Sequence, residues 1–154
     1  YMRTCREKTE ILHEGVPEFK LGKSEIIMEG RDAAIIACGA LMPEAVRAAK
    51  ALREKNISVS VLNCASIKPL DVKAVEKETE KGLIVSAEDG SVNGLGSAVA
   101  EIIAESRADC RLLRVGMNNS FAESGKPFDL LAKYGMDAAA IAKKVVIGLN
   151  QNRM

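Results

Sequence analysis

The order of apolar and amphipathic segments predicts an α/β protein, specifically a three-layer α/β/α sandwich. Its sheet is expected to be mostly parallel and five-stranded, mixed by one antiparallel edge strand. Continuous apolar runs, such as residues 33–38, are typical of central strands that are covered on both faces. Helical stretches separate successive runs, and such crossovers join parallel strands. One further strand-like segment, residues 24–29, precedes the first run by only a tight turn.

The helical stretches carry their own start and stop signals. Pro43 opens the first, because a proline at the beginning of a helix loses no hydrogen bond, and Ala45 and Leu52 share its apolar stripe. Gly82 suits the C-terminal end of the second helix, and Asp137 suits the N-terminal cap of the last. The expected helices span residues 43–55, 69–80, 94–106 and 137–149, and the expected central strands span residues 33–38, 57–62, 83–87 and 111–115.

The segment at residues 24–29 is expected at one edge of the sheet. The turn Gly30-Arg31-Asp32 connects it to the run that begins at Ala33. A connection this short permits antiparallel pairing, whereas parallel strands need a crossover.

The first part of the chain differs from the rest. Residues 1–22 are mostly polar, show no helical stripe and are interrupted by Gly15 and Pro17. We therefore divide the chain into a connecting arm, residues 1–22, which enters from a preceding domain, and one α/β domain, residues 23–154.

The overall composition is that of an ordinary globular domain, with 47% hydrophobic and 28% charged residues among 154. The net charge of +1 creates no field for nucleic acid or an anionic membrane, so we expect neither as a partner. No apolar run approaches the roughly 20 residues of a membrane span, and no secretory signal pattern is visible. We therefore expect a cytoplasmic protein.

The four cysteines are Cys5, Cys38, Cys64 and Cys110, and no two of them form a Cys-x-x-Cys motif. Zinc sites usually draw ligands from close pairs, so this spacing argues against a metal site on the chain. Cys38 and Cys64 lie in apolar, strand-like segments. We interpret the cysteines as reduced and mostly buried thiols.

The carboxyl ends of the predicted strands, where α/β sheets bind ligands, carry no complete catalytic set. Cys64 and Ser66 follow one strand, but the only histidine, His13, lies in the polar arm. A nucleophile would have to recruit it across the fold. We therefore predict no catalytic residue on this chain, and we interpret His13 as an exposed or packing side chain.

The loop from Glu88 to Gly96 is the richest of these strand ends. Its strand–glycine-loop–helix layout could present backbone N–H groups to a phosphate. However, Gly94-Leu95-Gly96 is followed by Val99, where a dinucleotide site requires glycine or alanine. We favour tight packing of the loop, with Glu88 and Asp89 supplying negative charge to the helix N-terminus.

Several phrases together resemble the C-terminal domain of the thiamine-diphosphate-dependent transketolase family, and they run in order over nearly the whole chain. Phe121-Ala122-Glu123-Ser124-Gly125 and Lys133-Tyr134-Gly135 look most like the transketolase branch whose C-terminal half can be a separate polypeptide. The other phrases are residues 22–26, 29–32, 45–52, 67–71, 88–89, 94–101 and 130–137.

This resemblance implies a division of labour. The complete enzyme would transfer two-carbon ketol units between sugar phosphates, as in the pentose phosphate pathway, with thiamine diphosphate and a divalent metal. Its missing N-terminal and pyrimidine-binding domains would hold that cofactor, and this chain would bind none of it. The C-terminal domain would support a homodimer and shape the edge of the active-site cleft, and it is expected to be inactive by itself.

The resemblance also implies one site residue. Tyr1-Met2-Arg3-Thr4 resembles the segment that closes the middle domain of these enzymes, where an arginine contacts the phosphate of the sugar substrate. A guanidinium suits this role, because it is always charged and can bind phosphate through two hydrogen bonds. We therefore predict that Arg3 contacts the substrate phosphate in the complete enzyme. The alternative is an exposed charge on a flexible arm.

Two other functions stay open. Lys68-Pro69-Leu70-Asp71 occurs in every branch of the family, so the chain could instead resemble a 2-oxoacid dehydrogenase E1 β-subunit or a deoxyxylulose-phosphate synthase. It could also be a stand-alone interaction module that dimerises and catalyses nothing.

Overall fold

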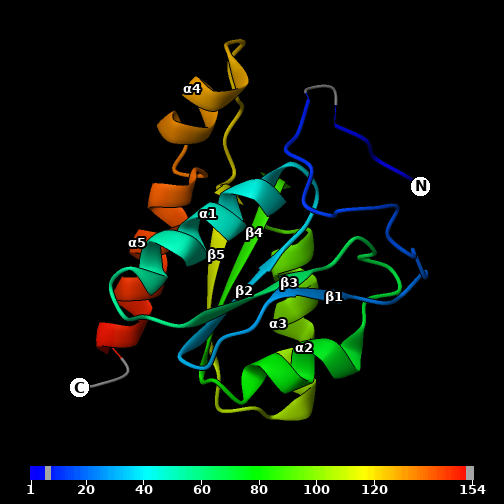
Figure 1. Cartoon of the computed structure of the whole chain (residues 1–154), viewed down its shortest axis with the longest axis vertical. Helices are drawn as coiled ribbons and strands as arrows, with labels where there is room; N and C mark the ends of the chain where they lie inside the picture. Colours follow the sequence, from blue (N-terminus) through cyan, green and yellow to red (C-terminus); the bar gives the residue numbers. More distant parts are fainter. Residues whose placement is uncertain (6–7, 152–154) are drawn as a thin grey trace.

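The computed structural model, which describes residues 1–5 and 8–151, contains one five-stranded sheet with helices on both faces (Figure 1). The strands lie in the order β1-β3-β2-β4-β5, and only the β1–β3 pair is antiparallel within the described residues. The predicted α/β sandwich with one antiparallel edge strand is confirmed. The strands are β1 Glu25–Met28, β2 Ala33–Ala37, β3 Val59–Asn63, β4 Leu83–Ser91 and β5 Arg111–Met117.

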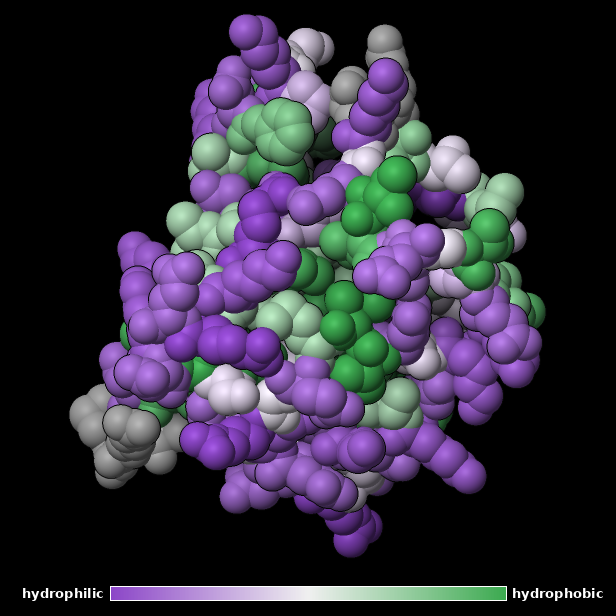
Figure 2. Space-filling view, viewed as in Figure 1, coloured by the Kyte–Doolittle hydropathy of each residue, from purple (hydrophilic) through white to green (hydrophobic). Residues whose placement is uncertain are grey.

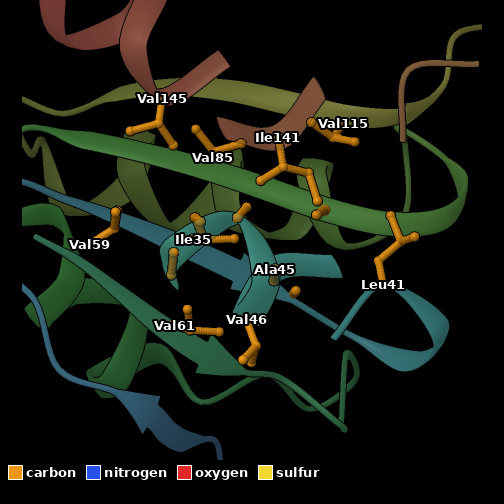
Figure 3. Close-up of a cluster of buried hydrophobic side chains, with 14 of the residues drawn as sticks. Ile35, Leu41, Ala45, Val46, Val59, Val61, Val85, Val115, Ile141 and Val145 are labelled. Atoms are coloured by element: carbon orange, nitrogen blue, oxygen red, sulfur yellow. The ribbon is translucent and has the colours of Figure 1, made fainter. Parts of the chain in front are cut away.

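Two apolar cores hold the three layers together. Helices α1 (Met42–Arg53) and α5 (Ala138–Gln151) cover one face of the sheet, and α2 (Val72–Thr79) and α3 (Leu95–Ser106) cover the other (Figure 1). Because successive strand residues point to opposite faces, Ile35 enters the first core and its neighbour Ile36 the second. Figure 3 shows the first core, where Ile35 and Val85 of the sheet meet Ile141 and Val145 of α5.

The partner of β1 differs from the expected one. The turn after β1 suggests pairing with the run at Ala33, but β3 lies between β1 and β2. The turn passes the start of β3, since the backbone N–H groups of Arg31 and Asp32 both donate to Ser58 O, at 3.0 and 2.8 Å. Gly30 makes this crossing possible, because a Cβ there would lie 2.1 Å from the carbonyl carbon of Val59.

The helix boundaries follow local capping. Helix α2 begins at Val72 rather than at Pro69, because the Asp71 side chain accepts the Ala74 N–H at 3.4 Å and so caps the helix one turn later. The predicted Asp137 cap is confirmed, with its carboxylate accepting the Ala140 N–H at 2.8 Å.

Two features escape the sequence patterns. A short helix, α4 (Pro127–Lys133), has only seven residues, which is too few for its apolar positions to define a helical period. Strand β4 continues to Ser91, past the expected end at Ala87, and it regains pairing with β5 through an irregularity between Ala87 and Ser91. A 3₁₀ turn, η1 (Gly39–Leu41), links β2 to α1.

The described part of the predicted arm forms no helix or strand, and residues 6 and 7 lie outside the described residues. The arm is held against the domain by side chains, and Leu12 packs against the first core. Three pairs connect them: Arg3 with Glu88 at 3.3 Å, Glu10 with Arg47 at 2.6 Å and His13 with Glu25 at 2.9 Å. Within residues 1–5 and 8–151, no helix is both long and apolar enough to cross a membrane.

Candidate functional site

The strand order changes direction between β2 and β4. From the carboxyl end of β2 the chain leaves through α1 to β3 on one side, and from the carboxyl end of β4 it leaves through α3 to β5 on the other. Loops that leave neighbouring strands in opposite directions open a crevice, and α/β proteins commonly bind ligands there. Cys38 follows β2 at this edge, and Glu88 lies in the last part of β4.

Glu88 is buried, with 7% of its surface exposed, and it is anchored on the N-terminus of α3. Its Oε2 atom accepts a hydrogen bond from the backbone N–H of Leu95, the first residue of α3, at 2.6 Å. Gly94 permits this approach, because a Cβ there would lie 2.2 Å from Glu88 Oε2. The carboxylate complements the positive end of the helix dipole, as the sequence suggested.

The hydrogen bond between Glu88 and Leu95 helps to decide whether the glycine loop binds a phosphate or packs closely. The backbone N–H of Leu95, the first residue of α3, already bonds to Glu88, so a phosphate at this helix start would lie beside a buried carboxylate. Gly96 packs beneath Arg114, since a Cβ there would lie 2.7 Å from Arg114 Cδ. Asp89 is exposed and does not share this role. The geometry therefore favours close packing as the purpose of the two glycines.

Arg3 reaches the same edge of the sheet from the arm. Its Nη2 atom donates to Glu88 Oε1 at 3.3 Å. A Cβ on Gly90 would lie 3.0 Å from Arg3 Nη1, so the guanidinium rests against the end of β4. The Arg3 side chain is 48% exposed, whereas that of Glu88 is 10% exposed. Arg3 is therefore held on one side and open to solvent on the other.

The cysteines at this edge are poor nucleophiles. Burial raises the pKa of the Cys38 thiol to about 12, and the nearby Glu88 carboxylate adds to the shift. Burial likewise raises the pKa of Cys64 to about 11. Both thiols therefore stay protonated at neutral pH, and the thiolate is the reactive form. All four cysteines are free, and Cys5 is the exposed one.

The histidine is not joined to a nucleophile. His13 Nε2 pairs with Glu25 Oε2 at 2.9 Å, while Ser66 Oγ donates to Pro69 O at 2.6 Å. A cavity of about 420 Å³ lies between arm residues 9–17 and the loops after β2 and β3, and His13 lines it. Its other titratable lining residue, Glu10, is paired with Arg47.

The donor set does not fit a divalent metal. Across residues 1–5 and 8–151, no three His, Cys, Asp or Glu side chains come together in an arrangement that could hold an ion.

Comparisons with known proteins identify the class. The family described as "Transketolase, C-terminal domain" matches residues 22–141. The chain therefore belongs to the transketolase C-terminal domain family.

Particular relatives agree with this assignment. A Methanocaldococcus jannaschii protein that bears a transketolase C-terminal-section name is 43% identical over 149 residues, which are 95% of this chain and 46% of that protein. A solved structure titled "Split gene transketolase, inactive beta4 tetramer" superposes with a TM-score of 0.89 at 35% identity, and the match covers 94% of this chain and 48% of that one. The chain thus spans about half the length of these relatives.

The family is shared with a second class of enzyme. A 1-deoxy-D-xylulose-5-phosphate synthase from Geobacter sulfurreducens is 39% identical over 134 residues, which are 85% of this chain and 21% of that protein. Family membership alone therefore does not select the reaction.

The contact between Arg3 and Glu88 is the feature that the sequence did not predict. The two residues are 85 positions apart, and no periodicity links a side chain on an irregular arm to a strand end. The one local signal is Gly94, because a glycine at a helix start indicates that another group packs closely against the backbone there.

Proposed function

We propose that the chain is the C-terminal, dimer-supporting section of a transketolase that transfers two-carbon ketol units between sugar phosphates. Family membership supports this proposal, and so does the extent of the match to the Methanocaldococcus protein, which covers 95% of this chain. The rest of the enzyme would be supplied by N-terminal and pyrimidine-binding domains outside these residues.

The observation that carries the proposal is the position of Arg3. Its guanidinium lies at the carboxyl edge of the sheet, held by Glu88 and open to solvent on its other side. We infer that Arg3 binds the phosphate group of the sugar substrate in the complete enzyme. A permanently charged, planar donor can bond two phosphate oxygens at once, and it would fix the substrate while the reaction proceeds elsewhere.

The cofactor would lie outside this chain. When bound, thiamine diphosphate supplies the chemistry that carries the two-carbon unit, and the family resemblance assigns it and its divalent metal to the missing domains. The contribution of this chain would be to bind and orient the substrate and to support the assembly. The isolated chain is accordingly proposed to be inactive.

Exposed apolar side chains support the proposed homodimer. Figure 2 shows apolar residues gathered among polar ones over β1 and the neighbouring arm. Large exposed side chains from these segments include Val16, Phe19 and Leu21 on the arm and Ile26 on β1. Surfaces of this kind often mark contacts with another subunit or domain. We propose the cytoplasm as the location of the enzyme, since all four thiols are free.

A reconstitution experiment tests this proposal. The chain is joined to, or mixed with, the preceding section of its native enzyme, and ketol transfer between sugar phosphates is measured with thiamine diphosphate and magnesium. Restored transfer supports a transketolase. Condensation of pyruvate with a triose phosphate would instead assign a deoxyxylulose-phosphate synthase, and oxidative decarboxylation of a 2-oxoacid would assign an E1 β-subunit. A dimer that never complements would indicate an interaction module.

Arg3→Ala tests the site within the same enzyme. Loss of a charged hydrogen-bond donor should raise KM for the sugar phosphate by about 10- to 100-fold, because such a bond typically contributes about 1.5–3 kcal/mol. The value of kcat should change much less, since the proposed contact is to the phosphate group and not to the reacting carbon atoms. A KM equal to that of the unmodified enzyme would refute the proposed contact.

A further inference from the structure

We propose that Glu88 is a positioning residue, whose carboxylate holds the Arg3 guanidinium in place for the phosphate of the substrate. This inference rests on the proposed role of Arg3 and adds a residue to it. Glu88 would act through Arg3 and would itself contact neither substrate nor cofactor.

Arg3 needs such support because it lies on an irregular segment. The described part of the arm, residues 1–5 and 8–22, forms no strand or helix that would fix it, and an arginine side chain has many rotamers. An unrestrained arginine would have to be ordered when the phosphate binds, which weakens binding. A side chain that is already held avoids most of that loss.

Glu88 is suited to be the fixed partner. It lies on β4, which has a neighbouring strand on each side, its side chain is 10% exposed, and its Oε2 atom accepts the Leu95 N–H at 2.6 Å. The short approach across Gly94 leaves the carboxylate little freedom to move. The arm arginine is therefore attached to a rigid part of the fold.

The division of the two carboxylate oxygens leaves Arg3 available. Oε2 is used by the helix, so only Oε1 faces Arg3, and the contact is a single hydrogen bond of 3.3 Å. A two-point guanidinium–carboxylate pair would occupy one full edge of the arginine. Here a single N–H is used, the side chain is 48% exposed, and other N–H groups can meet an anion from the open side.

Glu44 provides a matched control. It is also buried, its Oε2 atom accepts the backbone N–H of Ala138 at 2.8 Å, and its Oε1 atom pairs with Arg47. Ala138 is the first residue of α5, as Leu95 is of α3. The two glutamates thus share burial, a helix N-terminus and an arginine, but only Glu88 contacts Arg3.

The kinetic test compares Glu88→Gln with Glu44→Gln in the complete enzyme. Glutamine keeps an oxygen for the Leu95 N–H but removes the charge that holds Arg3. We expect KM for the sugar phosphate to rise about tenfold in Glu88→Gln, with kcat changed by less than about twofold. KM for the same sugar without its phosphate should not change. Glu44→Gln should leave each KM as it was.

A double variant separates positioning from a general structural effect. If Glu88 acts through Arg3, the Arg3→Ala/Glu88→Gln enzyme should have the KM of Arg3→Ala alone. Additive increases, or an unchanged KM in Glu88→Gln beside a raised KM in Arg3→Ala, would overturn the role of Glu88 and leave that of Arg3 standing. An unchanged KM in Arg3→Ala would remove both.

A second measurement does not depend on catalysis. Nitrogen relaxation of the Arg3 Nε–Hε group reports whether this side chain is ordered. We expect an ordered Arg3 in the unmodified protein and in Glu44→Gln, and a mobile one in Glu88→Gln. An Arg3 that is equally mobile, or equally ordered, in all three proteins would overturn the inference even if ketol transfer is observed. An Arg3 that becomes mobile only in Glu88→Gln would support it even if the reaction proves to be a different one.

Discussion

Glu88 and Glu44 have nearly the same local chemistry but belong to different parts of the molecule. Each is buried, caps the first N–H of a helix and meets an arginine. The arginine beside Glu44 is Arg47, which lies three residues further along the same helix, although it also pairs with Glu10 of the arm. The arginine beside Glu88 comes from the arm. The origin of the arginine, rather than the carboxylate, therefore distinguishes a candidate site from a structural contact.

Gly94→Ala should disrupt the packing around Glu88 and cause the largest loss of stability. The new Cβ would lie 2.2 Å from Glu88 Oε2, well inside contact distance, so the carboxylate must leave Leu95 or the loop must shift. Either change costs a buried hydrogen bond or adds strain, and we expect the free energy of unfolding to fall by about 2–4 kcal/mol. Urea denaturation measures this loss.

Gly15→Ala is the control for that substitution. A Cβ at Gly15 meets no atom within 4 Å, so the free energy of unfolding should change by less than about 0.5 kcal/mol. Equal stability of the two alanine variants would show that the carboxylate does not need the space left by Gly94.

Removing either carboxylate should also lower the free energy of unfolding, but by less than Gly94→Ala does. Glu88→Ala and Glu44→Ala each leave a helix N-terminal N–H without its acceptor and an arginine without its partner, and we expect each to lose about 1–3 kcal/mol. Nitrogen relaxation of the Arg3 Nε–Hε group separates the two variants, because only Glu88→Ala should increase the mobility of Arg3. A more mobile Arg3 in Glu44→Ala would contradict the distinction between the two pairs.

The fold could be predicted because its signals are local. The apolar run at Ala33–Ala37 reports burial on both faces, and the helical stretches between strands fix the parallel order. The pairing of β1 could not be predicted in the same way. It depends on Gly30 passing the backbone of Val59, and that contact is defined only once the strands are placed.

The candidate site likewise has one part that local sequence signals predict and one part that they do not. Negative charge at the start of α3 was predictable, because Glu88 precedes that helix closely in the sequence. The role of Arg3 as a site residue is implied by a family resemblance and not by a pattern in the sequence itself. Its contact with Glu88 spans 85 residues and depends on the path of an irregular arm, so no local rule could supply it.

The smallest expected effect concerns the thiol beside Glu88. The folded protein holds the pKa of Cys38 at about 12, above its ordinary value of 9.0, chiefly through burial and then through Glu88. Below pH 9 both folded and unfolded chains keep this proton. Above it the unfolded chain ionises while the folded one does not, so the free energy of unfolding falls as pH rises toward 12.

Cys38→Ala should remove the contribution of this thiol to the fall in the free energy of unfolding with rising pH. That contribution is at most about 1.4 kcal/mol per pH unit. Denaturation at several pH values between 8 and about 11 measures the difference, and any cavity left by alanine contributes equally at each pH. Glu88→Gln should lower the Cys38 pKa and thereby weaken the slope, whereas Glu44, which is not among the groups that shift this thiol, should have no effect when replaced by glutamine. If the free energy of unfolding falls equally with pH in the two glutamine variants, the charge of Glu88 does not act on Cys38, and the distinction between the two glutamates then rests on the arm contact alone.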